Sequence, residues 1–144
     1  GQAATFAAAN MNTYKYWFRD INAPWTLVPP VVPVPGVGEV PISFPLDATH
    51  AGEIPYVLYP QNVMEQRYTG DAEDLAELAG NMVAFWTQFA KYGDPNASDG
   101  TTTPWPQFSS GEVMQLTPEL DTPGISAFAE YHWCRYWAEP PLAL

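Results

Sequence analysis

Apolar side chains recur at helical spacing over one long stretch of the chain. Intervals of three and four positions gather them on one face of a helix, and they are Leu75, Leu78, Ala79, Met82, Val83, Trp86, Phe89 and Ala90. Asp71 is a candidate N-cap, Gly93 can adopt the left-handed conformation that ends a helix, and Pro95 prevents continuation. The pattern predicts a helix from Asp71 to Tyr92. Four of its side chains are expected to be buried against a sheet: Leu78, Met82, Trp86 and Phe89.

Three shorter segments also have a regular pattern. Aromatic residues alternate with period two from Asn12 to Arg19, which predicts one strand. Residues 113–116 lie between two turn-forming clusters and predict a short edge strand. A second helix is expected from Thr122 to Ala138, with Thr122 as its cap, Pro123 at its first position and Pro140 beyond its end.

Prolines are frequent between Ala23 and Pro45. Proline removes an amide donor and biases the preceding residue toward extended conformations, so this stretch predicts an irregular surface excursion and not a core element. A ligand for an SH3-like groove is one alternative. The valines interleaved with the prolines favour a packed loop.

Composition narrows the class of protein. The chain has 144 residues, of which 47% are apolar, enough for one globular domain. Its net charge of −11 repels phosphate backbones and anionic headgroups, so nucleic acid and membrane surfaces are poor candidate partners. No apolar run is long enough to span a membrane, and the first residues lack a signal-peptide pattern. The single cysteine, Cys134, excludes an internal disulfide and a Cys-based zinc site.

Candidate chemistry centres on His50, which lies in a loop of small residues. Ala48, Ala51 and Gly52 let the backbone pack closely while one imidazole projects, as a general base presented to a nucleophile requires. A surface or hydrogen-bonding histidine is the alternative that these residues leave open. The other histidine, His132, lies within the predicted C-terminal helix, where a structural role is favoured.

A metal site is not supported by the sequence. Zinc needs three or four ligands, and only His50 and Glu53 stand close enough to share one face. Glu53 is better explained as a buried or loop-bracing carboxylate near the imidazole, and Asp47 as a turn residue. No cofactor is expected.

Five motifs follow one another along nearly the whole chain. They are Tyr14-Lys-Tyr-Trp-Phe18, His50-Ala-Gly-Glu53, Phe85-Trp-Thr-Gln-Phe-Ala-Lys-Tyr-Gly-Asp-Pro-Asn96, Trp105-Pro-Gln-Phe108 and Cys134-Arg-Tyr-Trp137. Their kind and order resemble the C-terminal part of a type-B carboxylesterase, from the cholinesterase-like branch of the α/β-hydrolases. Two features depart from that pattern: Ala51 replaces the usual glycine, a sterically mild change, and the proline-rich stretch before Asp47 is longer.

The resemblance implies an α/β fold in which residues 1–144 are the C-terminal segment of a single α/β-hydrolase domain. This piece would supply the last sheet strands and the C-terminal helices, and not a complete domain. It implies ester hydrolysis through a serine acyl-enzyme, with His50 as the catalytic histidine. The expected partners are the N-terminal part of the same enzyme and an apolar or aryl ester, with four aromatic residues suited to such a substrate if they face the pocket: Trp17, Trp25, Tyr56 and Tyr59.

The rest of the implied machinery does not occur in this sequence. The family's serine stands in a Gly-x-Ser-x-Gly turn upstream of the histidine. Ser126 comes nearest, but it lacks the second glycine, follows His50 and fits the first turn of a helix. The other serines fit less well: Ser43, Ser98, Ser109 and Ser110. The triad acid would also lie upstream, since triad members usually come from separate loops, and neither Asp47 nor Glu53 suits that role.

Some expectations and alternatives follow from the resemblance. In disulfide-bearing members the cysteine of the last motif bridges to one upstream of the Tyr-x-Tyr strand, so Cys134 is expected here as a free thiol, shielded by Trp133 and Trp137. The isolated chain is expected to be inactive and to associate or partly unfold. A non-catalytic cholinesterase-like binding or adhesion domain and an independent acidic helical binding module stay open. A secreted or periplasmic location is slightly favoured over a cytoplasmic one.

Overall fold

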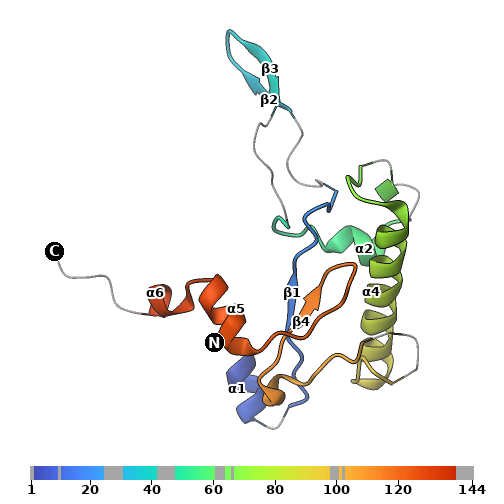
Figure 1. Ribbon diagram of the computed structural model, residues 1–144, viewed down its shortest axis with the longest axis vertical. Coiled ribbons are helices and arrows are strands. Elements are labelled where there is room, and N and C mark those ends of the chain that lie inside the picture. Colours follow the sequence, from blue (N-terminus) through green and yellow to red (C-terminus); the bar gives the residue numbers. More distant parts are fainter. Residues whose placement is uncertain are drawn as a thin grey trace, which may run out of the picture.

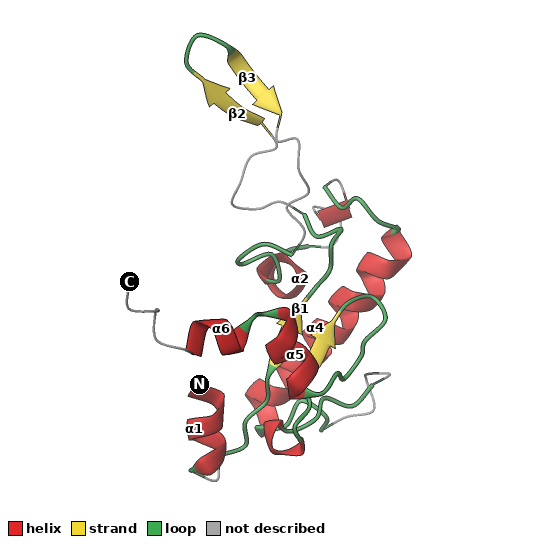
Figure 2. Ribbon diagram, turned by 60° about the vertical axis from the view of Figure 1, so that its left-hand side comes forward, coloured by secondary structure: helices red, strands yellow, loops and turns green. Residues whose placement is uncertain are grey.

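The computed structural model describes residues 2–9, 11–24, 31–41, 48–60, 64–65, 67–97, 101 and 103–138. Its helices are α1 (Gln2–Ala8), α2 (Ile54–Leu58), α4 (Ala72–Tyr92), the short 3₁₀ helix η1 (Phe108–Ser110), α5 (Ile125–Tyr131) and α6 (Cys134–Ala138). Its strands are β1 (Tyr16–Phe18), β2 (Val31–Val34), β3 (Gly38–Pro41) and β4 (Met114–Leu116). Figures 1 and 2 show their arrangement.

The centre of the fold is a parallel pair, β1 and β4, joined by a connection that contains α4 (Figure 1). Tyr16 lies opposite Met114, and Phe18 opposite Leu116. Parallel strands need such a crossover connection, and a covering helix is its usual form. The two predicted strands are therefore confirmed, both shorter than expected, and they pair with each other. The mixture of helices with a parallel strand pair agrees with the expected α/β class.

Side chains of β1 alternate between two differently covered faces. Tyr16 and Phe18 point to the side of α4 and α2, where Tyr16 contacts Trp86 and Phe18 contacts Tyr56. Trp17 points the other way and contacts Phe128 of α5. Coverage on both faces is what a parallel sheet requires.

The long helix α4 confirms the prediction for Asp71 to Tyr92 almost to the residue. Asp71 occupies the N-cap position, although its side chain makes no capping hydrogen bond, and Gly93 ends the helix with φ of 72°. Leu78 and Met82 are fully buried, as expected. The buried face differs from the prediction, however: Phe85 is fully buried, whereas Phe89 is 47% exposed.

The prediction for Trp86 and Phe89 is therefore wrong in part. Trp86 is only half-buried, and both rings line an open aromatic pocket beside the sheet. The fully buried side chains of α4 follow spacings of three, four and three: Leu75, Leu78, Met82 and Phe85. Phe85 lies next to the ring of Trp105, which has its centroid 5.1 Å away.

The proline-rich stretch is not irregular throughout, which corrects the expectation for Ala23 to Pro45. Ala23, at its start, is buried in the core. Residues 31–41 form an antiparallel hairpin of β2 and β3, drawn apart from the rest of the fold in Figure 1. The Val37 amide donates to the Val34 carbonyl (3.0 Å), with Pro35 and Gly36 between them. Gly36 has φ of 80°, and proline followed by such a residue is what a type II turn requires. Most hairpin side chains are exposed, so the packed loop is not observed there.

The single C-terminal helix predicted for residues 122–138 is also wrong. The Pro123 carbonyl accepts from the Val113 amide (2.9 Å), which holds this segment beside β4, and the helix begins only at Ile125 with Gly124 as its N-cap. A second break separates α5 from α6, because Trp133 has a left-handed φ of 53°. Ser126 lies in the first turn of α5, as expected.

Cys134 is a free thiol, as predicted, but it is not shielded. The residue is exposed at the start of α6. Trp133 and Trp137 are themselves 72% and 77% exposed and therefore do not cover it. Among the described helices, none is both long and apolar enough to cross a bilayer.

The corrected stripe of α4 gives a direct test of the packing. Phe85→Ala should lower the free energy of unfolding by about 3–5 kcal/mol, because it removes a large, fully buried side chain. Phe89→Ala, the matched control one turn later, should cost about 1 kcal/mol or less, since half of that ring is already in solvent. Urea denaturation monitored by circular dichroism measures both. Equal costs would show that the two phenylalanines are packed alike.

Candidate active site

His50 lies in a tight turn directly before α2. The Gly52 amide donates to the Thr49 carbonyl (3.0 Å), and Ala51 has a left-handed φ of 64°. The His50 side chain is exposed, and within the described residues nothing hydrogen-bonds to its ring. The turn therefore presents the His50 imidazole to solvent.

Alternate residues of the β1 segment hold the His50 loop. The Tyr16 hydroxyl donates to Glu53 Oε1 (3.3 Å). Phe18 lies so close to Gly52 that a Cβ added there would be 3.3 Å from its ring, and 3.0 Å from the Thr49 carbonyl oxygen. A side chain at position 52 would therefore be crowded by both neighbours. Glu53 braces the loop as predicted, through Tyr16.

Asp20 continues the same alternation two residues beyond β1. The carboxylate is 1% exposed and accepts three hydrogen bonds from residues that the structure describes. The Tyr56 hydroxyl (2.7 Å) and the Tyr68 hydroxyl (3.1 Å) donate to Oδ2. The backbone amide of Asn22 donates to Oδ1 (2.9 Å). No sequence pattern had singled out Asp20, because its partners lie far along the chain.

The two tyrosines are held as proton donors by this environment. Burial raises the pKa of Tyr56, and the hydrogen bond to the Asp20 carboxylate raises it further. Burial likewise raises the pKa of Tyr68, again with the charge of Asp20 adding to it. A tyrosine hydroxyl is already protonated at neutral pH, and the raised pKa of each extends its role as a donor to more alkaline pH.

The remaining candidate residues lie elsewhere or outside the described residues. His132 follows α5, where its Nδ1 is 2.9 Å from the Phe128 carbonyl oxygen and its ring stacks on Phe128, which confirms a structural role. The described serines near the C-terminus lie in η1 and α5. Asp47, Ser43, Ser98 and Trp25 fall outside the described residues. In the described part of the chain, no three His, Cys, Asp or Glu residues gather as a metal site.

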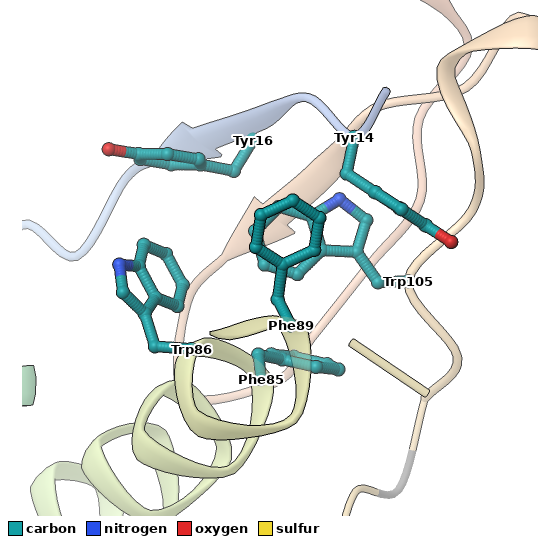
Figure 3. Close-up of a pocket in the computed structure, with 6 residues that line it drawn as sticks. All are labelled: Tyr14, Tyr16, Phe85, Trp86, Phe89 and Trp105. Atoms are coloured by element: carbon teal, nitrogen blue, oxygen red, sulfur yellow. The ribbon is translucent and has the colours of Figure 1, made fainter. Parts of the chain in front are cut away.

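An aromatic pocket of about 210 Å³ opens between β1 and α4. Figure 3 shows its six rings, which come from both elements and from the segment before η1. They are Tyr14, Tyr16, Phe85, Trp86, Phe89 and Trp105. Trp17, Tyr56 and Tyr59, suggested from the sequence as substrate contacts, are not among them. Tyr16 belongs to both features, since its ring lines the pocket while its hydroxyl binds Glu53 of the His50 loop.

Hydrogen bonds join two of the sequence motifs, residues 85–96 and 105–108, beside this pocket. The Asn96 side chain accepts from the Trp105 amide (2.7 Å) and donates to the Trp105 carbonyl (2.9 Å). Asp94 Oδ1 accepts from the Asn96 backbone amide (2.9 Å) and from the Tyr14 hydroxyl (3.3 Å). The Trp105 indole donates to the Lys15 carbonyl (3.1 Å), which ties the whole assembly to the β1 segment.

A sequence profile of the carboxylesterase family matches residues 2–137, nearly the whole chain. The chain belongs to the carboxylesterase family. This membership confirms the resemblance drawn from the five motifs.

Individual relatives match only part of this chain. A cholinesterase from Mus musculus is 32% identical over 88 residues, 61% of this chain and 14% of the relative. A bile salt-activated lipase from Homo sapiens is 28% identical over 100 residues, 67% of this chain and 13% of the relative. Carboxylesterase 3 from Homo sapiens is 34% identical over 68 residues, 46% of this chain and 11% of the relative. The chain therefore spans a small fraction of the length of these proteins.

The left-handed residue in the His50 turn predicts an unusual stabilising substitution. Ala51→Gly should raise the free energy of unfolding by about 0.5–1 kcal/mol, because glycine adopts φ near 64° without the steric cost that alanine pays. Gly52→Ala, the control at the next position, should lower it, since its Cβ would meet the Thr49 carbonyl and Phe18. Thermal unfolding measures both. A destabilising Ala51→Gly would contradict the turn geometry.

Proposed function

We propose that this chain is the part of a carboxylic-ester hydrolase that supplies the catalytic histidine, His50. Family membership and the exposed His50 turn, bearing an imidazole with no described hydrogen-bond partner, carry the proposal. The relatives are named as a cholinesterase, a lipase and a carboxylesterase, and we extend ester hydrolysis from them to this chain.

The proposed reaction is acyl transfer through a serine. A serine from an upstream part of the enzyme attacks the ester carbonyl, and His50 accepts its proton. The protonated imidazole then returns the proton to the leaving alcohol, and a second cycle with water releases the acid. An upstream Asp or Glu orients the imidazole and upstream amides bind the oxyanion. A metal has no role in this scheme.

The proposal that residues 1–144 are the C-terminal segment of one α/β-hydrolase domain has structural support. In the described residues β1 pairs with β4 alone in a two-stranded parallel sheet. Parallel sheets occur almost only as larger assemblies that are covered on both faces. Further strands from an upstream part would extend this sheet beside β1. The chain also spans only 11–15% of its relatives.

An apolar or aryl ester is the proposed substrate class. The aromatic pocket, joined to the His50 loop through Tyr16, supports this choice because its lining is wholly aromatic. In the complete enzyme the pocket contributes to substrate binding. The chemistry itself depends on His50.

The first test concerns the chain by itself. The 144-residue chain should release no product from a p-nitrophenyl ester and should not be labelled by a fluorophosphonate probe, because the serine and oxyanion hole are supplied by the upstream part. Adding the N-terminal portion of the enzyme should restore both signals, with the label on that portion. Labelling of Ser126, or of any serine of this chain, would overturn the assignment of the nucleophile.

The second test concerns His50 in the complete enzyme. His50→Ala should lower kcat by about four to six orders of magnitude, because loss of the histidine removes nucleophile activation. His132→Ala is the matched control: its ring stacks on Phe128 and accepts or donates only locally, so turnover should stay within about tenfold of the parent. Near-normal turnover of His50→Ala, or an inactive parent enzyme, would favour a non-catalytic binding domain.

A further inference from the structure

Asp20 is a buried charge that the proposed reaction does not use. It is 1% exposed, and burying a carboxylate costs several kcal/mol unless hydrogen bonds compensate it. Its three donors come from separate parts of the chain: Asn22 beside it, Tyr56 in α2 and Tyr68 before α4. A buried acceptor with three donors fixes the relative position of the segments that carry them.

The donor in α2 links Asp20 to the His50 turn. Tyr56 is 2% exposed, its hydroxyl donates to Oδ2 at 2.7 Å, and its ring contacts Phe18 with the centroids 5.3 Å apart. The Tyr56 amide donates to the Glu53 carbonyl (3.2 Å), so α2 and the His50 turn are continuous and hydrogen-bonded. A shift of Tyr56 would therefore move the turn that bears His50.

We propose that Asp20 is a positioning residue for His50, acting through the Tyr56 hydroxyl to hold α2 and the turn against β1. The role of His50 rests on the proposed function, whereas the anchoring of the loop does not. Asp20 does not touch the imidazole in this arrangement. It sets the place from which the imidazole projects, and a misplacement of about 1 Å is enough to lower a catalytic rate by two orders of magnitude.

The carboxylate suits this task better than an amide. All three of its partners are donors, so both oxygens must accept. Asparagine would place an NH₂ group either against the Asn22 amide or against the two tyrosine hydroxyls. A tyrosine hydroxyl can accept from that NH₂ group, but the hydroxyl's own proton then loses its charged acceptor. Asp20→Asn is therefore a nearly isosteric change that weakens the anchor and leaves the core volume intact.

A pair of hydroxyl deletions provides the sharpest experiment. Tyr56→Phe and Tyr68→Phe each remove one donor from the same Asp20 oxygen, but only Tyr56 belongs to the element that follows His50. Amide hydrogen exchange of the complete enzyme, read by mass spectrometry, should rise about tenfold over residues 49–56 in Tyr56→Phe and in Asp20→Asn. In Tyr68→Phe exchange over 49–56 should stay within about twofold of the parent chain.

Asp94→Asn is a second control, because Asp94 also accepts a tyrosine hydroxyl, that of Tyr14, at a site away from the loop. It should leave exchange over residues 49–56 unchanged. Unchanged exchange over 49–56 in Tyr56→Phe would overturn the proposal. So would an equal rise throughout α4, because that outcome would show a general loss of stability.

A kinetic measurement in the complete enzyme separates the anchor from the chemistry. Tyr56→Phe should lower kcat about tenfold with little change in KM, and Tyr68→Phe should leave both near the parent values. If His50 is not the base, the exchange pattern will appear without this kinetic difference, and only the proposed function fails. If Tyr56→Phe and Tyr68→Phe lower kcat equally, Asp20 is only a structural residue.

Discussion

Consecutive side chains of the β1 segment point to opposite faces of the sheet, and this period of two decides what each neighbouring element can contact. Tyr14, Tyr16, Phe18 and Asp20 face α4 and α2, and they reach Asp94, Glu53, Gly52 and Tyr56 in turn. Trp17 and Arg19 face the other way, with the Arg19 guanidinium over the rings of Trp17 and Tyr131. A slip of one residue would reverse the two sets. The His50 turn would then lose its contacts with Tyr16, Phe18 and Asp20 together.

The elements that the sequence predicted best are those set by local signals. In α4 the apolar spacing, the C-terminal glycine and the following proline agree, and its ends were found within one residue. The buried stripe was less predictable, because Phe85 and Phe89 are one turn apart and equally apolar. Their difference comes from Trp105, which lies over Phe85 from a distant part of the chain. The proline-rich hairpin, in contrast, had a usable local signal, since Pro35-Gly36 between valines suits a turn.

Long-range hydrogen bonds explain the remaining differences. Thr122 and Pro123 have the composition of a helix start, but pairing with residues beside β4 uses the Pro123 carbonyl and delays α5 to Ile125. For the candidate site, small residues and the family resemblance were enough to select His50, Gly52 and Glu53. Asp20 could not be selected in the same way, because its three partners are known only after the chain has folded.

Asn96 and Trp105 belong to two of the five family motifs, residues 85–96 and 105–108, and hydrogen bonds join them directly. The side-chain amide of Asn96 binds both the backbone N–H and the backbone carbonyl of Trp105, nine positions away, as a paired backbone segment otherwise would. The clamp fixes the two ends of the intervening segment, so the length of that segment is almost free to vary. Closing a loop of twice the length costs only about 0.6 kcal/mol more in entropy. Insertions between these two motifs therefore lower stability only slightly, so members of the family can differ in length there while the core beneath Trp105 is preserved.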